Sequence, residues 1–307
     1  MNRRTLLSTG ILICLGLFLS APSWAGQVVT QEVKAWAQKA VEGEKALKAP
    51  PARNTLAVLY FKNQTGQPEI DPLQKGIALL LITDLSKVKG LQVVERVQFQ
   101  ALVEELGMGA SGLVDPGTAP RVGKILGVRW IAGGEILRGK VEELRIQSSP
   151  LEVATQEILG QPFSEGQFRE LFRIEKELLF DLIKLLRVEV TPAEQEDLRR
   201  PCSTNPQALM ALFRGIAASD RQEYARAAEF YETALRDDER ICIARAALEE
   251  LRILGLIAGT KKSRELLRSL RDQTSLTDQL SPEDATKREK TPKDIPTPAN
   301  IGITFPK

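Results

Sequence analysis

The feature that most constrains the fold is an ordered alternation of strand and helix patterns over residues 56–135. Residues 56–61 are apolar at every position, which predicts a strand buried on both faces. A helical pattern follows over 73–88, and a second strand pattern over 91–96 ends in Glu-Arg. A third, glycine-containing strand pattern covers 128–137. Strands that alternate with helices are typical of an α/β fold, so we expect a small sheet flanked by helices.

The α/β pattern continues beyond the third strand. Apolar residues alternate with polar ones over 134–158, which predicts a hairpin or meander. A helical stripe over 165–188 is expected to return across the sheet. We therefore expect an α/β domain over residues 53–190, preceded by a helix and linker over 26–52.

An all-α region is expected to follow. Thr191-Pro-Ala-Glu194 begins it, and the stretch from Asn205 resembles one tetratricopeptide repeat. The residues that carry this resemblance are Gly215, Tyr224, Ala227, Tyr231 and Ala234. A degenerate second helix pair completes a tetratricopeptide-like helix-pair region over 191–272, and the proline-rich residues 273–307 are expected to form a disordered tail.

A family resemblance rests on ordered segments of the α/β region. These are Thr55-Leu-Ala-Val-Leu-Tyr-Phe61 with Asn63-Gln-Thr-Gly66, then Leu91-Gln-Val-Val-Glu-Arg96, then Leu126-Gly-Val-Arg-Trp-Ile-Ala-Gly-Gly-Glu135. They resemble the periplasmic domain of the curli-secretion (CsgG-like) family and its relative, the TolB amino-terminal domain. The resemblance implies a non-enzymatic protein that takes part in building the bacterial envelope.

The first 25 residues have the layout of a signal peptide. Arg3 and Arg4 precede an apolar segment over 6–19, and a small-residue site predicts cleavage between Ala25 and Gly26. A membrane anchor is the alternative, but about 14 apolar residues are short for a bilayer span. We expect a periplasmic protein without a membrane span in its mature chain, associated with the outer membrane only through a partner.

The chain contains no histidine, which excludes Ser-His-Asp hydrolases, Cys-His proteases and histidine-rich zinc sites. We predict no catalytic residue, no cofactor and no metal. The 42 basic and 40 acidic residues become equal in number once Arg3 and Arg4 leave with the signal peptide. A neutral chain lacks the positive electrostatic field that attracts nucleic acids, so no nucleic-acid partner is expected.

One glycine motif imitates a nucleotide site. The run Gly107-Met-Gly109-Ala-Ser-Gly112 fits the dinucleotide fingerprint G-x-G-x-x-G. That fingerprint must follow a strand and begin a helix, whereas residues 97–106 have helical spacing. Gly107 is therefore expected to end a helix.

Two cysteines remain after signal removal, Cys202 and Cys242. In an oxidising compartment they could form one disulfide, and we expect their positions near the starts of alternate helices to bring them together. A buried free thiol at Cys242 is the alternative. Both interpretations stay open at this point.

We expect the protein to act by protein-protein contact in cell-envelope or outer-membrane assembly or secretion, with envelope proteins bound through the helical region. A homo-oligomer also fits the sequence. The alternative function is a periplasmic receptor that holds a small molecule or glycan in the α/β cleft through Asn63, Gln64 and Arg96. In a competing interpretation Asn63 lies in a turn and Arg96 pairs with a carboxylate.

Overall fold

The structure is a computed structural model, and it describes residues 26–46, 54–108, 117–139 and 143–257. All of these residues belong to one compact unit that ends at Ile257. The expected signal peptide, the expected tail and the end of the expected second helix pair lie outside the described residues.

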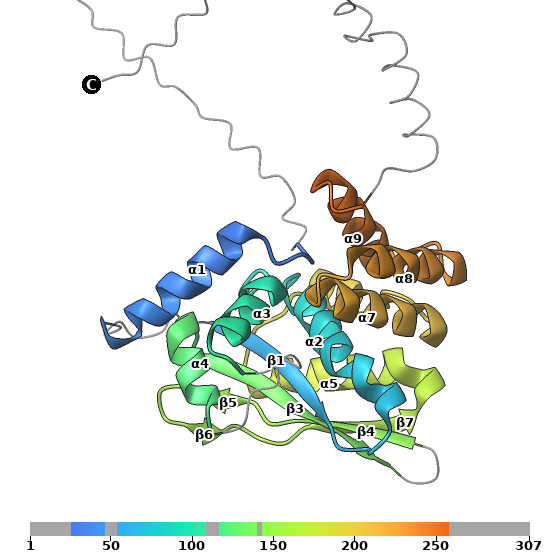
Figure 1. The fold of residues 1–307 in the computed structure, drawn as a ribbon. Coiled ribbons are helices and arrows are strands. Elements are labelled where there is room, and N and C mark those ends of the chain that lie inside the picture. The colour runs from blue at the N-terminus through green and yellow to red at the C-terminus, as the bar shows by residue number, and fades with distance from the viewer. Residues whose placement is uncertain (1–25, 47–53, 109–116, 140–142, 258–307) are drawn as a thin grey trace, which may run out of the picture. The chain divides into compact units, whose positions relative to one another are not determined.

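Within the described residues, seven strands form one mixed sheet (Figure 1). The main path has the order β2-β1-β3-β4-β7; β5 pairs with β3, and β6 pairs with β5. Strand β1 is parallel to β2 and β3, and the other pairs are antiparallel. The strands are β1 (Thr55–Asn63), β2 (Gln92–Val93), β3 (Trp130–Arg138), β4 (Glu143–Ser148), β5 (Leu151–Glu152), β6 (Glu157–Ile158) and β7 (Phe163–Gln167).

Strand β1 is the buried centre of the sheet, as its apolar sequence predicts. Every residue from Thr55 to Phe61 is buried, and β1 lies between β2 and β3. Beside it, Gly134 of β3 has no room for a side chain. A Cβ atom there would lie 1.9 Å from the backbone oxygen of Gln147 and 2.7 Å from the Phe61 ring. The glycine in this strand therefore lets β3 and β4 approach each other closely beside a buried aromatic ring.

Helices α2, α3 and α5 lie over the sheet in Figure 1, and α1 packs against α3. The helical elements of this part are α1 (Gln31–Glu42), η1 (Gly43–Ala46), η2 (Pro68–Ile70), α2 (Asp71–Leu85), α3 (Arg96–Glu105), α4 (Ala119–Leu126), η3 (Phe168–Glu170) and α5 (Leu171–Leu185). The expected fold class, a small sheet flanked by helices and followed by an all-α region, is confirmed.

Gly107 has a positive φ of 66° and follows the end of α3. Its amide donates a hydrogen bond to the carbonyl of Glu104. This arrangement agrees with the helix end expected from the sequence, because a glycine readily adopts the left-handed conformation there. The later glycines of the motif lie outside the described residues.

The expected start of the long helix at Glu165 is wrong. Residues Phe163–Gln167 form edge strand β7, and α5 begins at Leu171 after a 3-10 turn. The main-chain amide of Gln167 donates to the Glu170 carboxylate at 3.0 Å, and this capping box starts the turn. Pairing of β7 with β4 uses the backbone groups that the expected helix would have satisfied internally.

The carboxyl-terminal part is helical, and its helices are α6 (Pro192–Arg199), α7 (Pro206–Asp220), α8 (Tyr224–Asp237) and α9 (Cys242–Ile253). Helix α7 packs on α2 as well as on α8 (Figure 1). A Cβ atom on Gly215 of α7 would lie 2.4 Å from the ring of Tyr231 of α8, so this glycine allows close approach. The resemblance of this region to a tetratricopeptide repeat stays a prediction.

Among the helices of the described residues, none combines the length and the apolar character that crossing a membrane requires.

Candidate functional site

Arg96 is the first residue of α3, and its side chain is completely buried. Its Nη1 atom donates to both carboxylate oxygens of Asp220, at 3.0 Å each. Lys75 of α2 donates to Oδ2 of the same carboxylate at 2.6 Å. Asp220 is the last residue of α7, and its side chain is 2% exposed. One buried carboxylate therefore joins the helical region to two helices of the α/β part.

Further hydrogen bonds surround this carboxylate. The Tyr60 hydroxyl accepts a hydrogen bond from Arg96 Nη1 at 3.2 Å and donates to Gln100 Oε1 at 2.8 Å. Lys75 donates to the same Gln100 oxygen at 3.0 Å. Arg96 also donates to the backbone oxygen of Gln27 at 2.6 Å. We call Arg96, Asp220, Lys75, Tyr60 and Gln100 the junction network. Its hydrogen bonds offset the cost of burying these polar groups.

The charges of the junction network depend on one another. Burial lowers the pKa of Lys75, and the neighbouring Asp220 carboxylate opposes this effect. Burial acts in the same direction on Arg96, but Asp220 and Tyr60 raise its pKa above the ordinary value. Burial raises the pKa of Tyr60, which therefore remains a neutral hydroxyl. Two cations thus share the single anion Asp220.

Asn63 and Gln64 take part in a different set of hydrogen bonds. The Asn63 side chain donates to Asp71 Oδ1 at 2.8 Å, and its oxygen accepts from the Thr65 amide at 3.0 Å. Gly66 follows with a φ of 72°. Gln64 is exposed and donates to Glu135 at 3.4 Å. Asn63, the last residue of β1, thus closes the following turn with its side chain, which agrees with the competing interpretation.

The ligand role of Asn63, Gln64 and Arg96 stays a prediction. Arg96 pairs with a carboxylate and is 0% exposed, so a ligand would reach it only if the junction network opened. The three residues take part in two separate hydrogen-bond networks.

A surface cleft of about 460 Å³ lies where the two parts of the protein meet. We call it the helical groove. Its wall has contributions from η2, η3, α7 and α8, namely Glu69, Ile70, Phe168, Gln207, Met210, Ala211, Arg214, Phe230, Thr233 and Asp237. Ile70, Phe168, Met210 and Phe230 are half-buried apolar side chains, one from each element. The sequence indicates a groove on the helical pair, but it gives no signal that Ile70 and Phe168 complete it.

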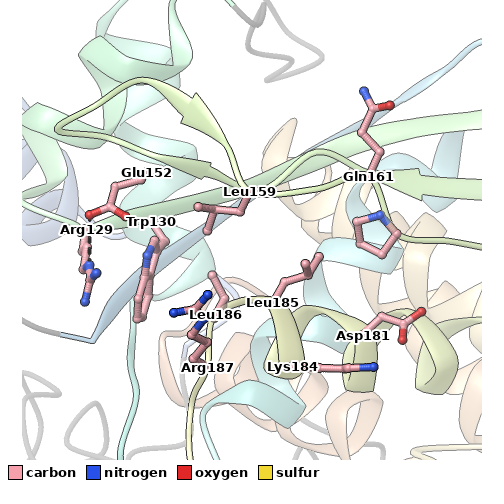
Figure 2. A pocket seen from close by; sticks show the side chains of 11 residues that line it. Arg129, Trp130, Glu152, Leu159, Gln161, Asp181, Lys184, Leu185, Leu186 and Arg187 are labelled. Atoms are coloured by element: carbon pink, nitrogen blue, oxygen red, sulfur yellow. Dashed lines mark hydrogen bonds and ion pairs between the residues drawn. The ribbon is translucent and has the colours of Figure 1, made fainter.

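A second cleft, of about 700 Å³, lies between the start of β3, the β5–β6 hairpin and the end of α5 (Figure 2). We call it the Trp130 pocket. Trp130, Leu159, Leu185 and Leu186 supply apolar surface, and the Arg129 guanidinium lies 4.5 Å from the Trp130 ring centre. The cleft expected from the sequence would lie elsewhere, beyond the carboxyl end of β1. The sequence carries no signal for the Trp130 pocket, because its walls come from three distant segments.

The charges of the Trp130 pocket are mixed. Arg129 Nε lies 3.2 Å from the Glu152 carboxylate, and Asp181, Lys184 and Arg187 line the side formed by α5. Arg187 has a positive φ of 53° directly after the end of α5. Glycine is the usual residue in that backbone conformation, so an arginine there is strained.

Cys202 and Cys242 are free thiols in the structure. They lie near enough for each thiol to shift the pKa of the other, raising that of Cys202 and lowering that of Cys242. The loops that carry them are joined by the Ser203 hydroxyl, which donates to Asp238 at 2.6 Å, and by Asn205, which donates to the backbone oxygen of Asp237 at 2.9 Å. A disulfide between the two cysteines stays a prediction.

Glu175 of α5 is another buried titratable group. Burial, followed by the nearby Asp84 carboxylate, raises its pKa from 4.5 to about 8. Such shifts are common among catalytic acids that line a cleft. The Glu175 side chain is only 3% exposed and lies 3.4 Å from Lys176, so a substrate has no access to it in this structure.

Comparison with known proteins gives one family match. Residues 37–138 match the family described as curli production assembly/transport component CsgG. These residues include β1, β2, β3 and helices α2 to α4.

A sequence relative and a structural neighbour are also similar to parts of the chain. The chain is 29% identical over 171 residues to "Putative adenylate cyclase 3" of Rhizobium meliloti (strain 1021), which amounts to 55% of this chain and 27% of the relative. The chain thus spans about a quarter of the length of that relative. The LpoB C-terminal domain from Salmonella enterica is a structural neighbour at 18% identity, with a TM-score of 0.33 over 44% of this chain and 98% of the domain.

Replacing Asp220 by asparagine is expected to destabilise the protein by about 3 kcal/mol, because it leaves the buried cations Arg96 and Lys75 without a counter-charge. Urea denaturation of the mature chain measures this change. Glu223→Gln is the matched control, because it removes the exposed Arg221–Glu223 ion pair three residues away and should change the midpoint much less. Equal midpoints for Asp220→Asn and the wild type would contradict the structural role of the junction network.

Proposed function

We propose that this protein is exported to the bacterial envelope and acts there as a non-enzymatic interaction protein in assembly or secretion. The observation that carries the proposal is the helical groove, a cleft to which both parts of the protein contribute apolar side chains. The family match over residues 37–138 supports an envelope role, since the family is described by curli assembly and transport.

The helical groove suits a protein segment with an apolar anchor. Its four half-buried apolar side chains offer contact area, and Glu69, Arg214 and Asp237 place charges of both signs around them. Apolar centres with polar rims are typical of protein-protein contacts. We therefore propose that a partner inserts one or two apolar side chains and pairs its flanking charges with the rim.

The proposal places the protein in the periplasm, with contact to the outer membrane through its partner. The division between an α/β domain over 53–190 and a tetratricopeptide-like region over 191–272 belongs to the same proposal. Whether the protein is a monomer or a homo-oligomer is measured by light scattering on the purified mature chain.

The described amino-terminal residues support the proposed signal cleavage. The amide of Gln27 donates to Glu250 at 2.6 Å, and the amide of Val28 donates to the other oxygen of that carboxylate at 3.2 Å. Glu250 belongs to α9, so the chain is anchored to the helical region two residues after Ala25. A new terminus at Gly26 would leave these contacts intact.

We expect protein recovered from the periplasm to begin at Gly26, because cleavage after Ala25 fits the small-residue site. Intact-mass spectrometry of the recovered protein measures the terminus. A chain that retains Met1, that is acylated at Cys14, or that begins beyond Val28 would contradict the proposal.

The non-enzymatic role rests on the absence of histidine and on the inaccessibility of Glu175. The activity named for the Rhizobium relative is not part of this proposal, because the chain covers about a quarter of that protein. Incubation of the mature protein with ATP and a divalent cation tests this directly, since formation of cyclic AMP would contradict the proposal.

A receptor for a small molecule is the second candidate function, and the Trp130 pocket favours it. An aromatic floor with arginine and lysine at its edge suits a small anionic ligand with an apolar group. A thermal-shift screen against small carboxylates and sugars discriminates between the two functions. Stabilisation of the wild type that is lost in Arg129→Gln would favour the receptor.

Met210→Glu and Arg214→Glu are expected to abolish capture of the native partner from envelope extract. The first substitution places a charge in the apolar centre of the helical groove, and the second reverses a charge at its rim. Quantitative mass spectrometry of cross-linked complexes, compared with those of the wild type, measures the loss.

Arg236→Glu is the matched control, because Arg236 is exposed on α8 outside the helical groove. It should capture the partner as the wild type does, and thermal melting should show all three variants folded. If the groove variants retain the partner, or if Arg236→Glu loses it equally, the helical groove is not the binding site.

A further inference from the structure

Two cysteines lie near each other in the helical region. Cys242 is exposed and is the first residue of α9, whereas Cys202 is half-buried in the loop that follows α6. The Ser203–Asp238 hydrogen bond of 2.6 Å joins the two loops and fixes the pair. Lys87, which follows α2, lies near both thiols and pairs with Asp84 at 2.6 Å.

We propose that Cys202 and Cys242 form a redox-active dithiol that exchanges with disulfides, in which Cys242 is the attacking thiol and Cys202 the resolving thiol. The substrate class is an accessible disulfide, either of low molecular weight or on a partner protein. This inference does not depend on the proposed binding function of the helical groove.

The reaction balances as two successive exchanges. The Cys242 thiolate attacks one sulfur of the incoming disulfide, a mixed disulfide forms, and the other half leaves as a thiolate that takes up a proton. Cys202 then loses its proton to solvent and attacks the Cys242 sulfur, so that the second half leaves as a thiol. One external disulfide is reduced to two thiols, and the Cys202–Cys242 pair is oxidised.

The local structure distinguishes the two sulfurs. The nearby Cys202 thiol and the backbone amides of Cys242 and Ile243 at the start of α9 stabilise the Cys242 thiolate. These groups, helped by Lys87, lower the pKa of Cys242 to about 6. The nearby Cys242 thiol, together with burial and the Asp84 carboxylate, raises the pKa of Cys202. The Asp197 carboxylate of α6 also lies near Lys87 and raises its pKa.

Exposure agrees with this order of events. An incoming disulfide can reach the exposed Cys242, whereas Cys202 is half-buried. A reactive, exposed thiol beside a less exposed one is the arrangement of thiol-disulfide exchange sites and redox sensors.

The test uses the mature protein, or the full chain with Cys14→Ser, because only these two cysteines then remain. Reduced protein is mixed with glutathione disulfide at neutral pH, quenched with acid and analysed by mass spectrometry. The wild type should form the intrachain disulfide without retained glutathione. Cys202→Ser should accumulate a mixed disulfide on Cys242, and Cys242→Ser should react much more slowly.

The rate of alkylation of Cys242 against pH is the second measurement. Followed on the Cys242 peptide of the reduced wild type, it should be half-maximal near pH 6, and Lys87→Gln should shift the midpoint upward. Lys89→Gln is the matched control, since Lys89 is exposed two residues away and its amide binds Glu194. Its midpoint should equal that of the parent protein.

Three results would overturn the proposal. The first is equal reactivity of Cys202→Ser and Cys242→Ser with glutathione disulfide. The second is a wild type that retains glutathione instead of closing the intrachain bond. The third is a disulfide that reduced glutathione cannot reopen, which would make the pair a fixed structural cross-link. Circular dichroism of each variant ensures that reactivity is compared between folded proteins.

Discussion

The buried carboxylate of Asp220 holds the protein's two parts in one arrangement. It ends α7, and its two partners, Arg96 and Lys75, belong to α3 and α2 of the α/β part. Buried ion pairs add little stability compared with apolar packing of the same volume, but removing one member leaves a buried charge without a partner. We infer that the junction network contributes mainly to the specificity of the fold. In any other position of α7 on the α/β part, Arg96 and Lys75 would be buried without an anion.

The position of α7 on the α/β part determines the shape of the helical groove. The helical groove combines Ile70 and Phe168 with Met210 and Phe230, so its shape depends on how the helical pair lies on the α/β part. The amino-terminal residues extend the same framework, since Gln27 binds Arg96 through its backbone oxygen and Glu250 of α9 through its amide. Helix α9 also begins with Cys242, which places the dithiol in a framework held by several elements.

Much of the fold could be predicted from the sequence, because its local signals agree with its tertiary contacts. The apolar run of β1 and the helix end at Gly107 are found where the sequence patterns predict them. Strand β7 was missed because Phe163–Gln167 carries only a weak alternation, and its identity is decided by pairing with β4. The candidate sites were harder to predict. Arg96 follows a strand and was therefore placed in a cleft, and only the fold reveals its partner Asp220, which lies more than a hundred residues further along the chain.

Native-state hydrogen exchange of the mature protein tests most directly the claim that both parts form one cooperative unit. If the two parts unfold together, the slowest amides of α2 and α7 open with the same free energy and respond equally to low concentrations of urea. Opening of α7 at a clearly lower free energy, while α2 and β1 stay protected, would contradict this cooperativity. It would show that the helical region unfolds independently of the sheet.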